Sequence, residues 1–119
     1  MEILSENTPR TPEILHEKNK GLLKITGRFI PEDPSLLFTQ LESIVEGSDR
    51  TDFTYDIDLE YFNSSVAKNL VNLLNISKSK FEEVNVNWSV DSSDDDTIEF
   101  VQNVGNLLDL KINLSKYDS

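Results

Sequence analysis

The sequence predicts a single α/β domain in which helices cover mainly one face of a mixed sheet. Its 119 residues suit one domain, because a typical domain has about 100–200 residues. Segments of alternating apolar and polar residues exchange along the chain with segments of helical periodicity, in the order β-β-α-β-α-β-α-β. The later strands are also polar on one side, whereas a sheet covered on both sides has continuous apolar strands. We therefore expect one open sheet face, acidic at the central strand.

The composition excludes several classes of function. The chain has 22 Asp and Glu against 11 Lys and Arg, which gives a net charge of −11. This charge argues against binding to nucleic acid or to an anionic membrane, since both need clustered basic residues. The absence of cysteine excludes disulfides, thiolate metal sites and a cysteine nucleophile. Without a secretory signal pattern or an apolar stretch of about 20 residues, we expect a cytoplasmic protein.

The first half of the chain is expected to begin with an antiparallel hairpin formed by residues 13–17 and 22–27. The turn between them ends at Gly21, which can adopt a positive φ. The first helix is then expected to have Asp33 as its cap and Pro34 as its first residue, since a proline there loses no hydrogen bond. A following Gly-Ser pair closes this helix.

Residues 52–61 give the clearest strand pattern in the chain. The odd-numbered positions are apolar or aromatic and most even-numbered positions are carboxylates, and a period of two places the two sets on opposite faces. The inward set is Phe53, Tyr55, Ile57, Leu59 and Tyr61. This parity predicts that the Tyr61 side chain lies in the core.

The second half repeats the exchange of helix and strand. Apolar residues at helical spacing predict a helix over 66–74, and alternation predicts a strand over 84–90. The run Asp94–Asp96 suits the positive N-terminal end of a third helix, which we expect to end at Gly105. Residues 108–114 alternate again and are expected to form the last strand.

Patterns typical of catalysis or metal binding are weak. His16 is the only histidine, and no catalytic motif surrounds it, so we interpret it as a structural or exposed residue. Asp91–Asp96 resembles a calcium loop only loosely, because the central Gly and the final Glu of an EF-hand are missing. A helix cap explains this run better. The plain alternation of Asp56, Asp58 and Glu60 favours an exposed sheet face.

The segment that joins the central strand to the second helix is more informative. Open α/β sheets place ligands and reactive groups at such junctions. Backbone N–H groups at a helix start are unpaired, and the helix dipole favours negative charge there. A phosphate on Ser64 or Ser65 would therefore be tolerated locally. The alternative is that Asn63 or Ser64 simply caps the helix, and the two roles are compatible.

Four groups of residues occur in the order found in one family of regulatory proteins. They are Thr11-Pro12-Glu13-Ile14, Gly27 with Pro31-Glu32, Leu59-Glu60-Tyr61-Phe62-Asn63-Ser64-Ser65 with Lys68, and Trp88 with Asp94–Asp96. With them the sequence resembles the SiaC-like regulatory phosphoproteins, relatives in fold of the STAS-domain anti-sigma-factor antagonists. The resemblance covers roughly residues 8–114 of a single domain spanning 1–119, with short ends expected to be flexible.

The resemblance implies a STAS-like fold and a non-enzymatic partner switch that needs no cofactor. Family members carry a phosphorylatable residue, usually Thr, at the position of Ser64; Ser65 is a second choice. A Ser/Thr kinase of the anti-sigma (GHKL) type would add the phosphate and a PP2C-type phosphatase would remove it. The unphosphorylated form would bind and control a diguanylate cyclase, which promotes biofilm growth. The anti-sigma-factor antagonists of related fold bind an anti-sigma kinase instead.

Residues around Ser64 are expected to contact the partner. They are Tyr61, Phe62, Asn63, Ser65 and Lys68. A phosphate in that interface would cost desolvation and repel nearby carboxylates, so the complex would dissociate. The competing hypothesis is an acidic module that binds a small ligand or a cation through Asp56, Asp58 and Glu60, with no phosphorylation.

Overall fold

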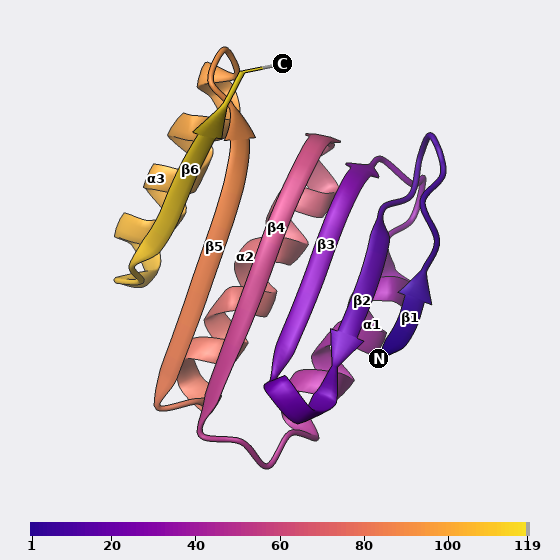
Figure 1. The fold of residues 1–119 in the computed structure, drawn as a ribbon, viewed down its shortest axis with the longest axis vertical. Coiled ribbons are helices and arrows are strands. Elements are labelled where there is room, and N and C mark those ends of the chain that lie inside the picture. The colour runs from indigo at the N-terminus through magenta and orange to yellow at the C-terminus, as the bar shows by residue number, and fades with distance from the viewer. Residues whose placement is uncertain (119) are drawn as a thin grey trace.

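The computed structural model describes residues 1–118, and within them the chain forms one six-stranded mixed sheet with three α-helices. The elements are β1 (Glu2–Ser5), β2 (Glu13–Glu17), the 3₁₀ turn η1 (Lys18–Lys20), β3 (Leu22–Phe29), α1 (Ser35–Glu46), β4 (Asp52–Phe62), α2 (Ser64–Lys80), β5 (Glu83–Asp91), α3 (Asp95–Leu108) and β6 (Ile112–Tyr117). The strands lie side by side in chain order, with β1, β2 and β3 antiparallel and β3 to β6 parallel (Figure 1). The predicted α/β class and mixed sheet are confirmed.

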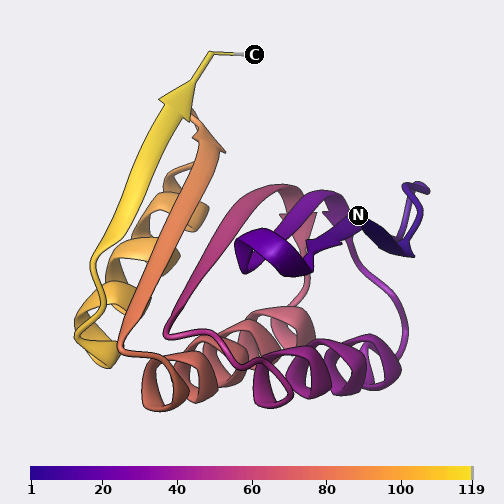
Figure 2. The same cartoon turned by 60° about the horizontal axis from the view of Figure 1, so that its bottom comes forward.

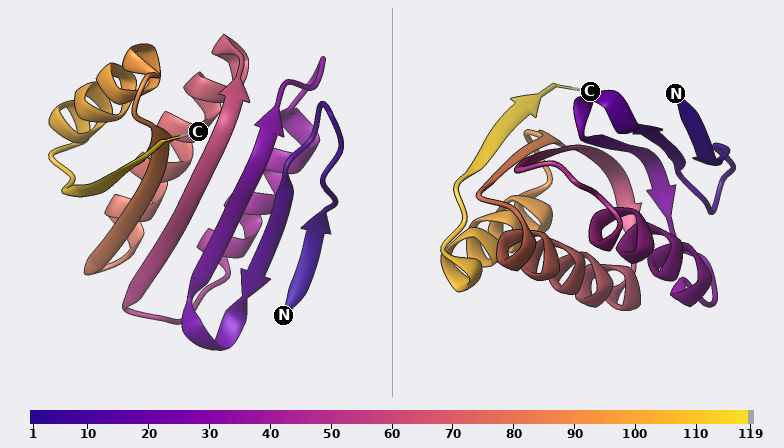
Figure 3. Two further views of the ribbon diagram at one scale, coloured as in Figure 1. Left: turned by 45° about the horizontal axis from the view of Figure 1, so that its top comes forward. Right: turned by 90° about the horizontal axis from the view of Figure 1, so that it is seen from below.

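All three helices pack against the same face of the sheet, as the sequence predicted (Figures 2 and 3). The inward positions of β3, β4 and β5 form the core together with the apolar stripes of the helices. The largest fully buried side chains include Trp88, Tyr55, Phe29, Phe38 and Phe53. The opposite face carries no helix and shows polar side chains, because period two places every second residue there.

One buried polar pair lies inside this core. The hydroxyl groups of Tyr55 and Ser77 are 2.5 Å apart, and the Ser77 hydroxyl donates to the Leu73 carbonyl at 2.9 Å. Tyr55 therefore donates to Ser77, and both hydroxyls are satisfied away from water. Burial raises the pKa of Tyr55 well above its ordinary value. This bond fixes α2 against the middle of β4.

The structure adds β1, a strand that the sequence pattern did not indicate. β1 pairs antiparallel with β2, and a bulge between Ile3 and Ser5 interrupts its register. Only half of its residues are partly covered, so it shows no clean alternation of apolar and polar residues. β1 and the last residues of β6 lie in the segments that were expected to be flexible ends, and both are paired to neighbouring strands. Residue 119 lies outside the described residues.

The third helix continues past Gly105, so the predicted helix end was wrong. α3 runs to Leu108, and Asp109 ends it with a left-handed φ of 51°. Gly105 is needed for a close approach: a Cβ there would stand 3.0 Å from the Leu110 carbonyl oxygen, and the Leu110 N–H donates to the Gly105 carbonyl. The last strand consequently begins at Ile112, not at residue 108.

The first helix also starts one residue later than predicted. Pro34 is its N-cap residue and Ser35 is its first helical residue. The prediction that Asp33 is the cap residue was therefore wrong by one position. The Asp33 carboxylate still accepts the Ser35 N–H at 2.9 Å and the Ser35 hydroxyl at 2.5 Å, from the residue before the N-cap. These bonds lower the pKa of Asp33 below its ordinary value, the hydroxyl bond contributing most.

Candidate functional site

Ser64 is the first residue of α2, and Asn63 caps the helix before it. The Asn63 side-chain oxygen accepts the Val66 N–H at 2.9 Å, and its amide donates to the Pro31 carbonyl at 3.3 Å. The second bond fixes the β4–α2 junction to the loop that follows β3. Of the two capping candidates, the structure selects Asn63. The Ser64 hydroxyl is therefore free of a capping role.

Both serines at this helix start face solvent. Among residues 1–118, neither hydroxyl makes a hydrogen bond; the Ser65 backbone carbonyl accepts the Asn69 amide at 2.8 Å. Ser64 stands at the positive end of a 17-residue helix, where an added anion is favoured by the helix dipole. Lys68 is exposed one turn later, and the i,i+4 spacing places it on the same side of the helix as Ser64.

A bulge at the end of β4 reverses the predicted positions of two aromatic residues. Gly27 pairs with Leu59 but Arg28 pairs with Tyr61, so Glu60 is an extra residue in β4. Period two is broken there, and Tyr61 is 58% exposed on the helix-free face. The prediction that Tyr61 lies in the core was wrong. Phe62 turns inward instead, with its ring 5.4 Å from that of Phe100 and 6.3 Å from that of Trp88.

The structure therefore divides the predicted contact residues into two groups. Tyr61, Ser65 and Lys68 are exposed, while Asn63 and Phe62 are half-buried and have structural partners. Sequence reasoning missed Arg28, whose guanidinium lies 5.8 Å from the Tyr61 ring centroid. Only the register between β3 and β4 brings this arginine beside Tyr61, and no spacing in the sequence encodes that register.

Other residues considered from the sequence have structural partners. His16 is largely buried, and its Nδ1 lies 3.6 Å from a Glu2 carboxylate oxygen. Asp94 accepts the Thr97 N–H and caps α3, as the helix-cap interpretation predicted. Asp56 accepts from Asn87 at 2.9 Å, and Asp58 accepts from Tyr117 at 3.0 Å. Within residues 1–118, no group of three or more His, Asp or Glu side chains is placed to hold a metal ion.

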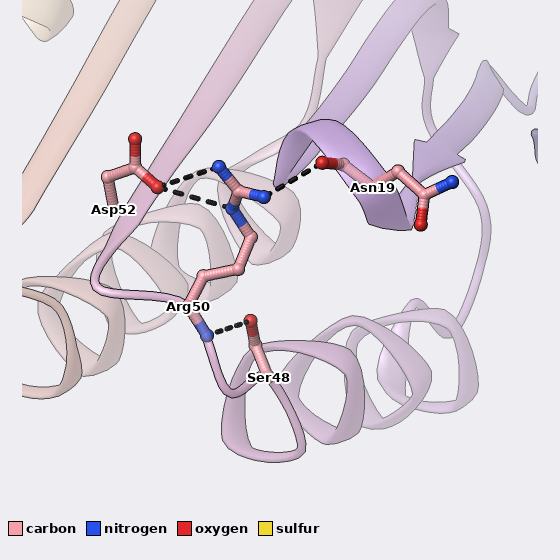
Figure 4. Close-up of polar contacts among 4 residues, drawn as sticks. All are labelled: Asn19, Ser48, Arg50 and Asp52. Atoms are coloured by element: carbon pink, nitrogen blue, oxygen red, sulfur yellow. Dashed lines mark hydrogen bonds and ion pairs between the residues drawn. The ribbon is translucent and has the colours of Figure 1, made fainter.

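A cavity of about 910 Å³ lies at the opposite end of the sheet, beside η1 and the loop that follows α1. Figure 4 shows that Arg50 braces it: the guanidinium donates to Asp52 at 2.9 and 3.2 Å and to the Asn19 carbonyl at 2.8 Å. Gly21 packs under this side chain with a φ of 60°, as predicted, and an added Cβ would stand 2.3 Å from the Arg50 Nε. The arginine is thus held in place by bonds within the fold, which leaves the Ser64 junction as the stronger candidate.

The family model for SiaC family regulatory phosphoproteins matches residues 5–117 of the chain. The chain belongs to this family. The match spans nearly the whole domain, including the β4–α2 junction with its exposed serines. The resemblance suggested by the Asn63-Ser64-Ser65 block is confirmed.

Solved structures with the same fold come from Pseudomonas aeruginosa. Apo-SiaC is 23% identical, with 97% of this chain and 99% of that chain covered and a TM-score of 0.78. A second SiaC structure is 24% identical over the full length of both chains, with a TM-score of 0.78. SiaC, the activator, in complex with the diguanylate cyclase SiaD gives 21% identity, coverage of 93% and 96%, and a TM-score of 0.79. At these identities the likeness shows the shared fold.

A search of curated proteins gives no significant match. Among the described residues, no helix is long and apolar enough to cross a membrane.

Proposed function

We propose that this protein is a non-enzymatic partner switch controlled by reversible phosphorylation of Ser64. The observation that carries the proposal is the exposed Ser64 hydroxyl at the first position of α2. Asn63 performs the capping, so phosphorylation of Ser64 removes no hydrogen bond from the fold. The family match to regulatory phosphoproteins supports this proposal.

A phosphate at Ser64 acts on binding and leaves the fold in place. The added charge of about −1.5 to −2 lies at the positive end of the α2 dipole, with Lys68 one turn away. Folding is therefore not opposed. A partner that covers this surface must instead desolvate the phosphate, which is costly without a matched cation. The unphosphorylated form binds the partner, and phosphorylation releases it.

The surface beside Ser64 has the composition of a protein-binding site. Tyr61 and Arg28 stack on the helix-free face next to the junction, and tyrosine and arginine are enriched among residues that dominate binding energy. The output partner we propose is a diguanylate cyclase, since the related SiaC forms a complex with the cyclase SiaD as its activator. In this role the protein binds and activates, and carries no catalytic group of its own.

The kinase assignment is tested by mass spectrometry. The protein is incubated with ATP and the GHKL-type Ser/Thr kinase from the same organism, and the phosphorylated residue is located in tryptic peptides. We expect one phosphate on Ser64, none in Ser64→Ala, and normal labelling in the matched control Ser65→Ala. A PP2C-type phosphatase with Mn²⁺ should remove it. Unchanged labelling of Ser64→Ala would refute the assignment.

The output is tested by measuring cyclic di-GMP formed from GTP by the diguanylate cyclase of the same organism. Unphosphorylated protein should raise the rate, and protein phosphorylated by the kinase should not. Phosphorylated Ser65→Ala should behave as phosphorylated wild type does. Equal stimulation by both forms would contradict the switch. No stimulation by either would contradict the choice of a cyclase as partner.

A further inference from the structure

The ladder between the two central parallel strands stops before either strand ends. β4 and β5 pair from Asp52 with Glu83 to Ile57 with Trp88, yet β4 continues to Phe62 and β5 to Asp91. Figure 1 shows the two strands diverging toward their C-terminal ends. Residues 58–62 of β4 and 89–90 of β5 therefore flank a split in the middle of the sheet, beyond the last pair of the β4–β5 ladder.

Aromatic side chains fill the helix side of this split. Phe62 from the end of β4, Trp88 from β5 and Phe100 from α3 contact one another, with ring centroids 5.4 to 6.3 Å apart. Their bulk occupies the space between the diverging strands. Trp88 is fully buried, and its indole N–H has no hydrogen-bond partner among the described residues. The split is thus closed on the helix side and can open only on the helix-free face.

A cavity of about 510 Å³ lies on that open face. Its walls come from the ends of β3 and β4, from the β5–α3 loop and from Tyr117 of β6. Gly27, which has a φ of +122°, contributes no side chain to its wall. The Tyr117 hydroxyl reaches past β5 and donates to Asp58 at 3.0 Å, so one side-chain bond spans the split.

The charge of this cavity is of one sign. Asp58, Glu60, Asp91 and Asp94 line it, and no lysine, arginine or histidine does. The negative field is concentrated around Tyr117, where burial together with Asp58, Asp91 and Glu60 raises the pKa of the phenol to about 12. Within residues 1–118 these carboxylates do not form a metal-binding group. A cation carried on a side-chain stem therefore suits a cavity of this volume better than a bare ion does.

We propose that the split between β4 and β5 is a second contact surface of the switch, and that it receives an arginine or lysine side chain from an extended segment of the protein partner. The occupant is inferred from charge complementarity with the cavity and from the strand ends of β4 and β5 that lie beyond their last ladder pair. The proposal rests on the proposed function. Phe62 ends β4 and Ser64 begins α2, so the split and the phosphorylation site share one junction.

The test measures binding of the unphosphorylated protein to the diguanylate cyclase of the same organism by calorimetry. Asp58→Asn combined with Glu60→Gln should weaken binding about tenfold or more, because charges facing a cationic side chain are lost. The matched control is Glu82→Gln combined with Glu83→Gln, two exposed residues at the other end of the sheet with the same charge change. It should bind as the wild type does.

The variant Tyr117→Phe separates the effect of the cavity's charge from the effect of its shape. It removes the bond across the split and alters one wall of the cavity but keeps every carboxylate, so binding should weaken clearly less than in Asp58→Asn with Glu60→Gln. A loss as large as that of the Asp58 and Glu60 variant would overturn the proposal, because the cavity's shape and not its charge would then matter. Wild-type affinity in Asp58→Asn with Glu60→Gln would overturn it as well.

Two more readouts complete the test. Hydrogen exchange of the amides at 58–62 and 89–91 should slow in the complex, and unchanged exchange at both segments would count against an occupant in the split. Saturable binding of Ca²⁺ or Mg²⁺ by the free protein, lost in the carboxylate variant, would replace the proposal with a cation site. If the proposed function is wrong, the result is different, because the wild-type protein itself will not bind the cyclase.

Discussion

The two ends of the parallel strands differ in how their polar groups are engaged. At the N-terminal ends, Arg50 directs its guanidinium to Asp52 and to the Asn19 carbonyl and makes three hydrogen bonds within the fold (Figure 4). At the C-terminal ends, the Ser64 hydroxyl has no partner among the described residues and the β4–β5 ladder is interrupted. We call the end held by Arg50 the braced end of the sheet. We call the end with Ser64 and the interrupted ladder the open end.

This difference follows from the geometry of parallel strands with crossover helices. The helices that follow β3, β4 and β5 all begin at the C-terminal ends of the strands, which brings unpaired N–H groups and positive dipole ends to that edge. Recognition is therefore expected there. Substitutions at the braced end should change stability, and substitutions at the open end should change binding.

Among these variants, Ser64→Glu should have the largest effect on cyclase binding, and it tests the open end. A carboxylate placed in the interface cannot be desolvated cheaply, so we expect binding to the cyclase to weaken about a hundredfold, or roughly 2.8 kcal/mol. The unfolding temperature should be unchanged or slightly higher, because the helix dipole favours a negative charge at the helix start. The matched control is Ser79→Glu at the exposed C-terminal end of α2, which should bind normally. Equal losses in both variants would contradict a local switch.

The neighbouring aromatic residues should separate the two kinds of effect on one strand. Phe62→Ala removes a half-buried ring from the Trp88 and Phe100 cluster and should lower the free energy of unfolding by about 2 kcal/mol. Tyr61→Ala removes an exposed ring and should lower it by less than about 0.5 kcal/mol, while weakening cyclase binding about tenfold. Urea denaturation and calorimetry check the pair. A large loss of stability in Tyr61→Ala and a small one in Phe62→Ala would indicate that Tyr61 lies in the core, and would contradict the bulge.

Arg50→Ala should affect stability alone and so defines the braced end. It breaks three hydrogen bonds to Asp52 and Asn19; the arginine is partly exposed, and we expect a loss of about 1–2 kcal/mol in the free energy of unfolding. Lys20→Ala, a more exposed cation of the same cavity, is the control and should cost less than about 0.5 kcal/mol. If the Arg50→Ala variant bound the cyclase more weakly under conditions in which it is fully folded, the braced end would also recognise the partner.

The sequence predicted the elements whose periodicity is unbroken. β2, β4 and β5 and the start of α3 follow from alternation and capping residues, since each depends on neighbours along the chain. It failed where packing between distant segments decides. Gly105 remains helical because the chain returns closely over it at Leu110, and parity could not reveal the bulge that turns Tyr61 outward.

The positions of the candidate-site residues in the fold were predictable to a similar extent. Ser64 and Lys68 come from a contiguous motif at a helix start, which local rules describe well. Arg28 and the split at Ile57–Trp88 depend on register and on the size of side chains from β4, β5 and α3. Register and side-chain packing are properties of the assembled sheet, so no pattern within one segment predicts them.

The smallest predicted effect concerns the titration of Tyr117 at the open end. Burial and the carboxylates of Asp58, Asp91 and Glu60 raise its pKa to about 12, against an ordinary value near 10. A raised pKa in the folded state means that the folded protein keeps the proton after the unfolded chain has lost it. The resulting stability is fully present below pH 10 and is lost between about pH 10 and 12. The effect is small because Tyr117 is 38% exposed and solvent screens its neighbours.

Urea denaturation from pH 9 to 12 measures this loss against Tyr117→Phe. Buried Tyr55 also has a raised pKa and contributes in the same direction to both proteins, so it cancels in the difference. The wild type should lose stability more steeply above pH 10 than the variant does, and added salt should reduce that difference, because the three carboxylates act partly through solvent. Parallel curves would mean that the negative field at the split is already neutralised, and the braced end and the open end would then not differ in their electrostatics.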